Sequence, residues 1–139
     1  MNDVDIGSVL PHRSPALLLM RVVRTDGTFL DGQGCIPPAH PLAENGRAPV
    51  VLGVELGAQA AGALEVLRRD AGERLEGYLV AIRRARFHAL DLPVDELLAV
   101  TATRTGGTGP LAIADIRVSD PDGGALLVEA SVTTWKQGA

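Results

Sequence analysis

The sequence contains a single cysteine among its 139 residues, so Cys35 has no partner for an internal disulfide bond. The first seven residues lack the basic segment and following apolar stretch that a secretion signal requires. Both absences favour the reducing cytoplasm as the place where the chain folds and acts.

Long apolar runs and an excess of positive charge are also absent. The longest weakly polar run, 50–67, is interrupted by Glu55 and Gln59 and falls short of the apolar span that a bilayer requires. The formal net charge of -4 argues against a nucleic-acid partner, because that affinity rests on clustered lysine and arginine. We therefore expect neither a membrane segment nor nucleic-acid binding.

Motifs for metals, phosphates and nucleophilic serine are missing as well. The sequence has no C-x-x-C or H-E-x-x-H spacing, no G-x-S-x-G and no glycine-rich phosphate loop, which predicts no metal and no cofactor. His12 lies in a proline-flanked N-terminal turn and His88 at the end of a predicted strand. We interpret both as hydrogen-bonded or solvated structural residues rather than catalytic ones.

The length and the 46% of apolar residues suit one compact domain over 1–139 with one core. A helix is expected at 50–69, because this stretch is rich in alanine and leucine, lacks internal proline and is apolar on nearly every face. Strands are expected at 16–23, 29–36, 77–88, 97–105, 111–119 and 125–135.

The last two predicted strands show the clearest alternation, which predicts one buried face on each. These faces consist of Ala112, Ala114, Ile116 and Val118, and of Val128, Ala130, Val132 and Thr134. The connections 106–110 and 120–124 are short and rich in turn residues, so neighbouring strands are expected to pair as antiparallel hairpins. The predicted fold class is α+β, with a long antiparallel sheet and one buried helix.

Two polar residues, Glu55 and Gln59, share one face of the otherwise apolar helix because they lie four positions apart. Burial would raise the pKa of Glu55 and prepare it to donate a proton near neutral pH. Alternatively, Glu55 is half exposed in the first turn, where the helix dipole favours negative charge. The spacing supports both interpretations equally, and in the first Gln59 would orient the carboxyl group.

His40 lies in the proline-bounded loop that leads into the helix, and histidine suits general base catalysis. A loop histidine is more often a surface residue, so this interpretation needs further support. The cluster of Arg83, Arg84 and Arg86 is either a solvated strand face or a patch for an acidic carrier protein.

Three segments carry a family resemblance, in the family's order and across most of the chain. The string L-P-H-R-S-P-A-L-L-L at 10–19 resembles the L-P-H-R-x-P-x-L-L opening of the bacterial beta-hydroxyacyl-acyl carrier protein dehydratases. The string E-L-G-A-Q-A-A-G at 55–62 is similar to their catalytic-helix pattern E-x-x-A-Q-x-x-G. The residues at 81–87 and 94–97 are similar to their A-R-F strand and the following P-x-D-x-L turn.

The loop before the helix differs from the usual family pattern. It reads H-P-L-A-E-N-G-R-A-P at 40–49, whereas the usual pattern is H-F-P-G-x-P-x-x-P-G. This loop is more similar to the dehydratase-like proteins of aryl polyene and related polyketide-type clusters. The acyl chain and the pathway therefore stay open.

The resemblance implies a hotdog fold, in which a curved antiparallel sheet wraps around one long central helix. It implies a dimer, either a homodimer or a heterodimer with a related hotdog subunit, in which each site joins a histidine of one subunit to an acidic residue of the other. By motif position these residues are His40 and Glu55. The implied reaction dehydrates a 3-hydroxyacyl thioester to the trans-2-enoyl thioester, on the phosphopantetheine arm of acyl carrier protein.

In the expected mechanism, neutral His40 takes the C2 proton and protonated Glu55 gives a proton to the departing hydroxyl. Backbone N–H groups of Val50 and Val51 at the helix start would polarise the thioester oxygen. One alternative is a hotdog thioesterase in which Glu55 activates water. Another is a non-catalytic carrier-docking subunit of a heterodimeric dehydratase.

Overall fold

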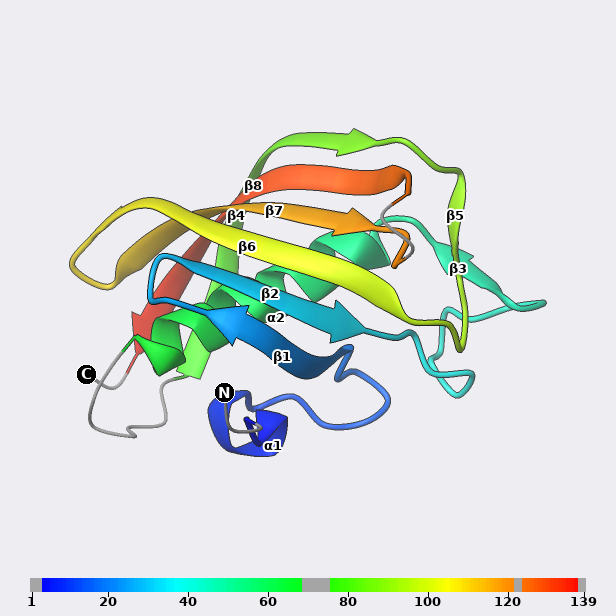
Figure 1. The fold of residues 1–139 in the computed structure, drawn as a ribbon, viewed down its shortest axis with the longest axis horizontal. Coiled ribbons are helices and arrows are strands. Elements are labelled where there is room, and N and C mark those ends of the chain that lie inside the picture. Colours follow the sequence, from blue (N-terminus) through cyan, green and yellow to red (C-terminus); the bar gives the residue numbers. More distant parts are fainter. Residues whose placement is uncertain (1–3, 69–75, 122–123, 138–139) are drawn as a thin grey trace.

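The computed structural model describes residues 4–68, 76–121 and 124–137. Within this part of the chain, two helices and eight strands follow one another as in Figure 1. In chain order they are α1 (Ile6–Val9), β1 (Leu19–Thr25), β2 (Phe29–Gly34), β3 (Arg47–Pro49), α2 (Leu52–Leu67), β4 (Glu76–Phe87), β5 (Asp91–Pro93), β6 (Leu98–Thr108), β7 (Leu111–Ser119) and β8 (Leu126–Gln137).

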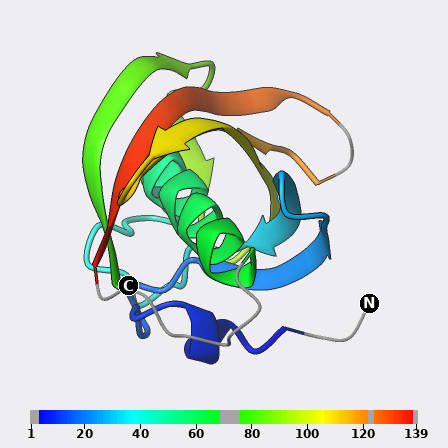
Figure 2. The ribbon, with the colours of Figure 1, turned by 90° about the vertical axis from the view of Figure 1, so that its left-hand side faces the viewer.

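Six strands form one sheet in the order β1-β2-β6-β7-β8-β4, and all neighbours in it are antiparallel. The sheet curves around α2, which runs along its concave side (Figure 2). The short strands β3 and β5 pair separately. This arrangement confirms the predicted hotdog fold.

The faces predicted from alternation are buried as expected. Alternate side chains over 112–118 of β7 and 128–134 of β8 face α2 and are at most 7% exposed. These are Ala112, Ala114, Ile116, Val118, Val128, Ala130, Val132 and Thr134. The hairpins β6–β7 and β7–β8 confirm the antiparallel pairs predicted from their connections, and β1 and β2 also pair as an antiparallel hairpin.

Two glycines allow α2 to lie close against the sheet. A Cβ on Gly57 would lie 2.4 Å from the Cδ1 of Ile116, and one on Gly53 would lie 2.6 Å from a methyl group of Val128. Such distances are far below van der Waals contact, so any side chain at these positions would push the helix away from β7 and β8. The two glycines lie four positions apart and therefore share one face of the helix.

Several element boundaries differ from the prediction. The helix begins at Leu52 rather than at residue 50, and residue 69 lies outside the described residues. Gly106 and Gly107 were predicted to lie in the β6–β7 turn, but both belong to β6 and pair with β7. Gly107 has φ +155, and a Cβ there would lie 2.6 Å from the carbonyl oxygen of Leu111, so the close pairing requires glycine.

The sequence prediction missed α1, β3 and β5, which span only three or four residues each. Segments this short carry no measurable periodicity. The β3–β5 pair joins the end of the His40 loop to the segment after β4, and it thereby holds the start of α2. None of the helices in the described part of the chain is long and apolar enough to cross a bilayer.

Candidate active site

Glu55 lies in the first turn of α2 and is not fully buried. Its side chain is 39% exposed. In the single chain, Glu55 is therefore a half-exposed acid near the positive end of the helix dipole, which was the second of the two interpretations. The carboxylate is nevertheless held by two neighbouring side chains, His12 and Gln59.

Gln59 is 2% exposed and makes four hydrogen bonds. Its Nε2 donates to Glu55 Oε1 at 3.1 Å and to the carbonyl oxygen of Ala16 at 2.9 Å. Its Oε1 accepts from the N–H groups of Leu18 and Leu19 at 2.8 and 3.0 Å. Gln59 therefore binds the carboxylate of Glu55, and it also attaches the segment before β1 to the helix.

His12 contacts Glu55, although the sequence reasoning did not assign it to the site. Its Nε2 lies 3.3 Å from Oε1 of Glu55. The interpretation of His12 as a hydrogen-bonded residue is correct, but its partner is the candidate catalytic acid. The sequence signal for this contact is the L-P-H-R-x-P opening, which includes His12 and also carries the family resemblance.

The prediction that burial raises the pKa of Glu55 is wrong for the single chain. The hydrogen bond from His12 is the largest influence and lowers the pKa of Glu55 below its usual value. Desolvation raises the pKa, but the hydrogen bond from Gln59 and the charges of His12 and His40 lower it further. Hydrogen bonds to the ionised form outweigh burial here because the side chain keeps contact with solvent.

His40 lies in the loop before β3, near enough to influence the pKa of Glu55. Within the described residues, however, Glu55 has His12 and Gln59 as its contact partners, and His40 is not among them. The Nδ1 of His40 accepts the N–H of Leu42 at 3.1 Å. This bond assigns the proton of the neutral ring to Nε2.

The start of α2 lies beside Glu55 and presents backbone donors. The N–H groups of Gly53 and Val54 donate to the carbonyl oxygens of Val50 and Val51, which closes the first turn. The N–H groups predicted to bind the thioester oxygen, those of Val50 and Val51, lie just before this turn. The side chain of Val51 is 50% exposed, so the helix start is open to solvent in the single chain.

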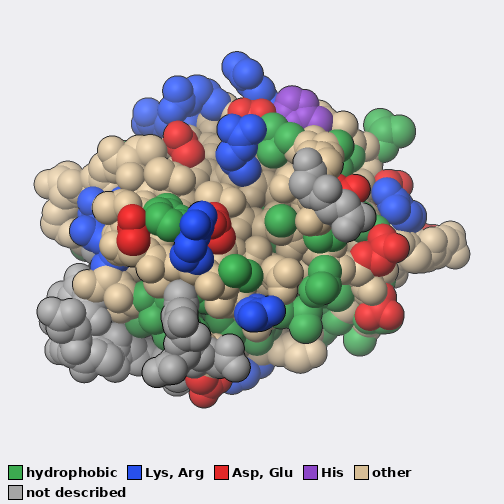
Figure 3. All heavy atoms as spheres, viewed as in Figure 1, with side chains coloured by type: hydrophobic (Ala, Val, Ile, Leu, Met, Phe, Trp, Pro, Cys, Tyr) green, Lys and Arg blue, Asp and Glu red, His purple; other side chains and the backbone are tan. Residues whose placement is uncertain are grey.

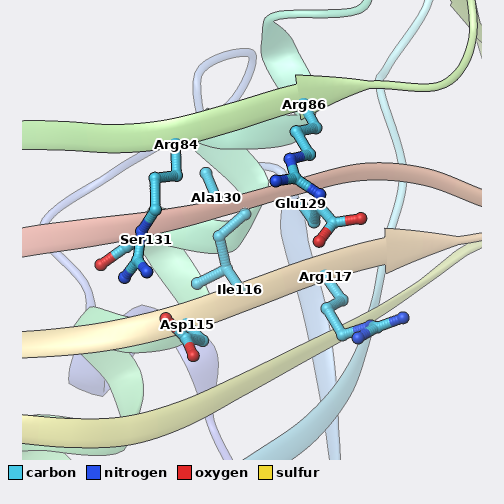
Figure 4. A pocket seen from close by; sticks show the side chains of 8 residues that line it. All are labelled: Arg84, Arg86, Asp115, Ile116, Arg117, Glu129, Ala130 and Ser131. Carbon is cyan, nitrogen blue, oxygen red and sulfur yellow. The ribbon is translucent and has the colours of Figure 1, made fainter.

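The arginine cluster lies on the convex face of the sheet, away from α2. Arg84 and Arg86 on β4 line a hollow together with Arg117 on β7, while Arg83 does not line it (Figure 4). A bulge in β4 separates the pairing of Arg83 from that of Arg86, and Arg84 in this bulge has φ +53. Asp115, Glu129 and Ser131 also line the hollow, so its charge is mixed.

No group of three or more histidine, cysteine, aspartate or glutamate side chains suited to a metal ion occurs among the described residues. The carboxylate of Glu55, the imidazoles of His12 and His40 and the N–H groups at the helix start can take part in proton transfer and hydrogen bonding.

Comparison with solved structures supports the fold. The dehydratase heterocomplex ApeI:P from Xenorhabdus doucetiae matches with a TM-score of 0.83 at 19% identity, covering 97% of this chain and 92% of that chain. A thioesterase from Haemophilus influenzae matches with a TM-score of 0.61 at 14% identity, covering 84% and 76%. At such identities these matches show a shared fold only.

Sequence relatives are dehydratases. The 3-hydroxyacyl-[acyl-carrier-protein] dehydratase FabZ of Brucella ovis is 38% identical over 97 residues, which cover 66% of this chain and 62% of the relative. The chain thus aligns with about three fifths of that relative's length. The enzyme of the same name from Bartonella bacilliformis is 32% identical over 139 residues, covering 91% and 90%. The family model described as ApeP-like, ApeP dehydratase, matches residues 4–138, and this chain therefore belongs to the ApeP-like dehydratase family.

Proposed function

We propose that this protein dehydrates a 3-hydroxyacyl thioester carried on acyl carrier protein, giving the trans-2-enoyl thioester. The observation that carries the proposal is the held carboxylate of Glu55 at the start of α2, in a chain of a dehydratase family. Relatives named as 3-hydroxyacyl-[acyl-carrier-protein] dehydratases support the substrate class. The lone Cys35 fits a reducing cytoplasm as the site of the reaction.

The working unit is a dimer, formed with an identical subunit or with a related hotdog subunit. β4 is the last strand in the sheet order, and it exposes Leu79, Val80 and Ile82, with Val80 at 53%. An apolar strand at the edge of a sheet favours pairing with another chain. The similar fold of a dehydratase heterocomplex supports a hotdog partner.

Glu55 and His40 form the catalytic pair of this proposal. Dehydration removes a proton from C2 and expels the hydroxyl from C3, so one group must accept a proton and another must donate one. His40 takes the C2 proton at Nε2, and Glu55 gives a proton to the departing oxygen, which leaves as water. The N–H groups of Val50 and Val51 stabilise the negative charge that develops on the thioester oxygen.

This assignment requires two changes from the single chain. Glu55 must gain a proton, although its pKa is lowered. A second subunit and the acyl chain would cover its exposed side, and the added desolvation favours the neutral acid. His40 must carry its ring proton on Nδ1. Nδ1 must then lose its hydrogen bond from the Leu42 N–H and donate to an acceptor instead.

The acidic carrier protein docks on the arginines of β4. Figure 3 shows Lys and Arg side chains gathered along the top of the molecule, where Figure 1 places the edge strand β4. Arg83, Arg84 and Arg86 are all exposed, and Arg84 and Arg86 share their hollow with Arg117. Clustered cations increase the encounter rate with an acidic partner at low salt.

The test is to incubate the protein with 3-hydroxyacyl carrier proteins of several chain lengths and to detect loss of water by mass spectrometry. His40→Ala and Glu55→Gln should each lower turnover about 100-fold or more, as expected for a lost general base or acid. The double variant should lose little beyond the worse single change, because residues that act as one unit are strongly non-additive. His40→Asn keeps an N–H donor, so substantial activity in this variant would refute the base role.

Other products would refute the proposal. Release of free acid and bare carrier protein would identify a thioesterase, the function named for one of the proteins with a similar fold. Binding of carrier protein without turnover, even with a related hotdog subunit added, would identify a docking subunit. Near-wild-type turnover in a correctly folded Glu55→Gln variant would remove Glu55 from the mechanism.

A further inference from the structure

We infer that His12 is a positioning residue for Glu55, holding one carboxylate oxygen so that the other faces the substrate. This role rests on the proposed function of Glu55 in proton transfer. Both donors, His12 Nε2 at 3.3 Å and Gln59 Nε2 at 3.1 Å, lie against the same oxygen, Oε1. Oε2 is therefore the oxygen that can exchange a proton with the substrate hydroxyl.

The segment that carries His12 is anchored to α2 by the residue that also holds Glu55. Gln59 binds the carbonyl oxygen of Ala16 and the N–H groups of Leu18 and Leu19, just after His12 in the sequence. The Arg13 side chain adds bonds to the carbonyl oxygens of Leu10 and His12. His12 is thus held in a fixed segment and does not reach Glu55 from a free surface loop.

The other ring nitrogen of His12 indicates which form of the ring makes the contact. Nδ1 is buried and has no hydrogen-bond partner within the described part of the chain. An N–H group at Nδ1 would be buried without an acceptor, which costs free energy. Nε2 is therefore the ring nitrogen that donates its N–H, and Oε1 of Glu55 accepts it.

His12 also controls how readily Glu55 becomes protonated. The titratable groups that influence Glu55 are His12 from the N-terminal segment and His40 from the loop before β3, while Gln59 on its own helix is uncharged. The His12 hydrogen bond is the largest cause of the lowered pKa of Glu55, and desolvation opposes it. Without His12, desolvation has less opposition and the pKa of Glu55 rises.

The experiment follows the Glu55 carboxyl directly, by carbon NMR of protein labelled at the glutamate side-chain carboxyl. The Glu55 signal is assigned by its absence in Glu55→Gln. In His12→Ala the titration midpoint of Glu55 should rise, and in His12→Gln, which keeps an N–H donor, it should return toward the wild-type midpoint. An unchanged midpoint in a folded His12→Ala variant would overturn the inference.

His88 provides a matched control, because its Nε2 lies 2.9 Å from the Glu129 carboxylate, outside the site. The hydrogen bond from His88 lowers the pKa of Glu129, so His88→Ala should move the Glu129 midpoint and leave that of Glu55 unchanged. An equal shift of Glu55 in both variants would indicate a general effect on the fold and would refute a specific role for His12.

Kinetics separate this inference from the proposed function. His12→Ala should lower kcat about 10-fold with little change in KM, since a lost hydrogen bond misplaces the acid without removing it. The pH profile of kcat/KM should move to higher pH together with the NMR midpoint. If the wild-type protein dehydrates no substrate, the proposed function fails, while the NMR titration still decides whether His12 holds Glu55.

Discussion

Replacing Gln59 with leucine should be among the most destabilising single changes in α2. Leucine has a similar volume, but it removes the oxygen that accepts the N–H groups of Leu18 and Leu19, two fully buried residues. Each buried N–H left without an acceptor costs about 1–3 kcal/mol, and added apolar packing offsets part of this cost. We expect a net loss of about 3 kcal/mol in the free energy of unfolding, or roughly 10 °C in Tm for a chain of this size.

The assay is urea unfolding followed by circular dichroism, at one fixed protomer concentration because association would shift the apparent stability. Gln33→Leu is the matched control, since Gln33 lies half buried on β2 and should tolerate the same change within about 0.5 kcal/mol. Equal, small losses of unfolding free energy in the two variants would refute the argument that Gln59 supplies the acceptor for the N–H groups at the start of β1.

Three further predictions concern the helix packing, acid stability and carrier docking. Gly57→Ala should lower the free energy of unfolding by about 1–3 kcal/mol, because the added Cβ would clash with β7. At Gly62 a Cβ would lie 3.6 Å from its nearest neighbour, so Gly62→Ala should leave the stability to thermal unfolding unchanged or increase it. Folding lowers the pKa of Glu55 below its usual value of 4.5, so the ionised carboxylate stabilises the fold above pH 4.5 and this stabilisation disappears as the pH falls through the folded pKa. Glu55→Gln should therefore weaken the dependence of the unfolding free energy on acid pH. An unchanged pH dependence in this variant would contradict the lowered pKa. Arg84→Ala should raise KM for a carrier-bound substrate but not for a short pantetheine thioester. As a control, replacing the exposed Arg24 on β1 with alanine should leave the KM of both substrates unchanged. The same KM for the carrier-bound substrate in both variants would argue against docking on β4.

The sequence by itself determined the elements whose signals are local. Alternation identified the buried faces of β7 and β8, because side chains of a strand point to opposite sides in turn. Alanine and leucine content identified α2, and the spacing of Glu55 and Gln59 placed both on one helical face. The three motif segments indicated the family without any knowledge of tertiary contacts.

Only the tertiary structure decided the surroundings of Glu55. His12 and Glu55 belong to segments far apart in the chain, and no periodicity links them, so their contact depends on how Gln59 anchors the N-terminal segment. This contact also reversed the predicted direction of the Glu55 pKa, because hydrogen bonds to a carboxylate oppose the effect of burial. Likewise, only the paired sheet brings Arg84 and Arg86 of β4 to the same hollow as Arg117 of β7, which is distant in the sequence. The bulge in β4 shifts the register between Arg83 and Arg86.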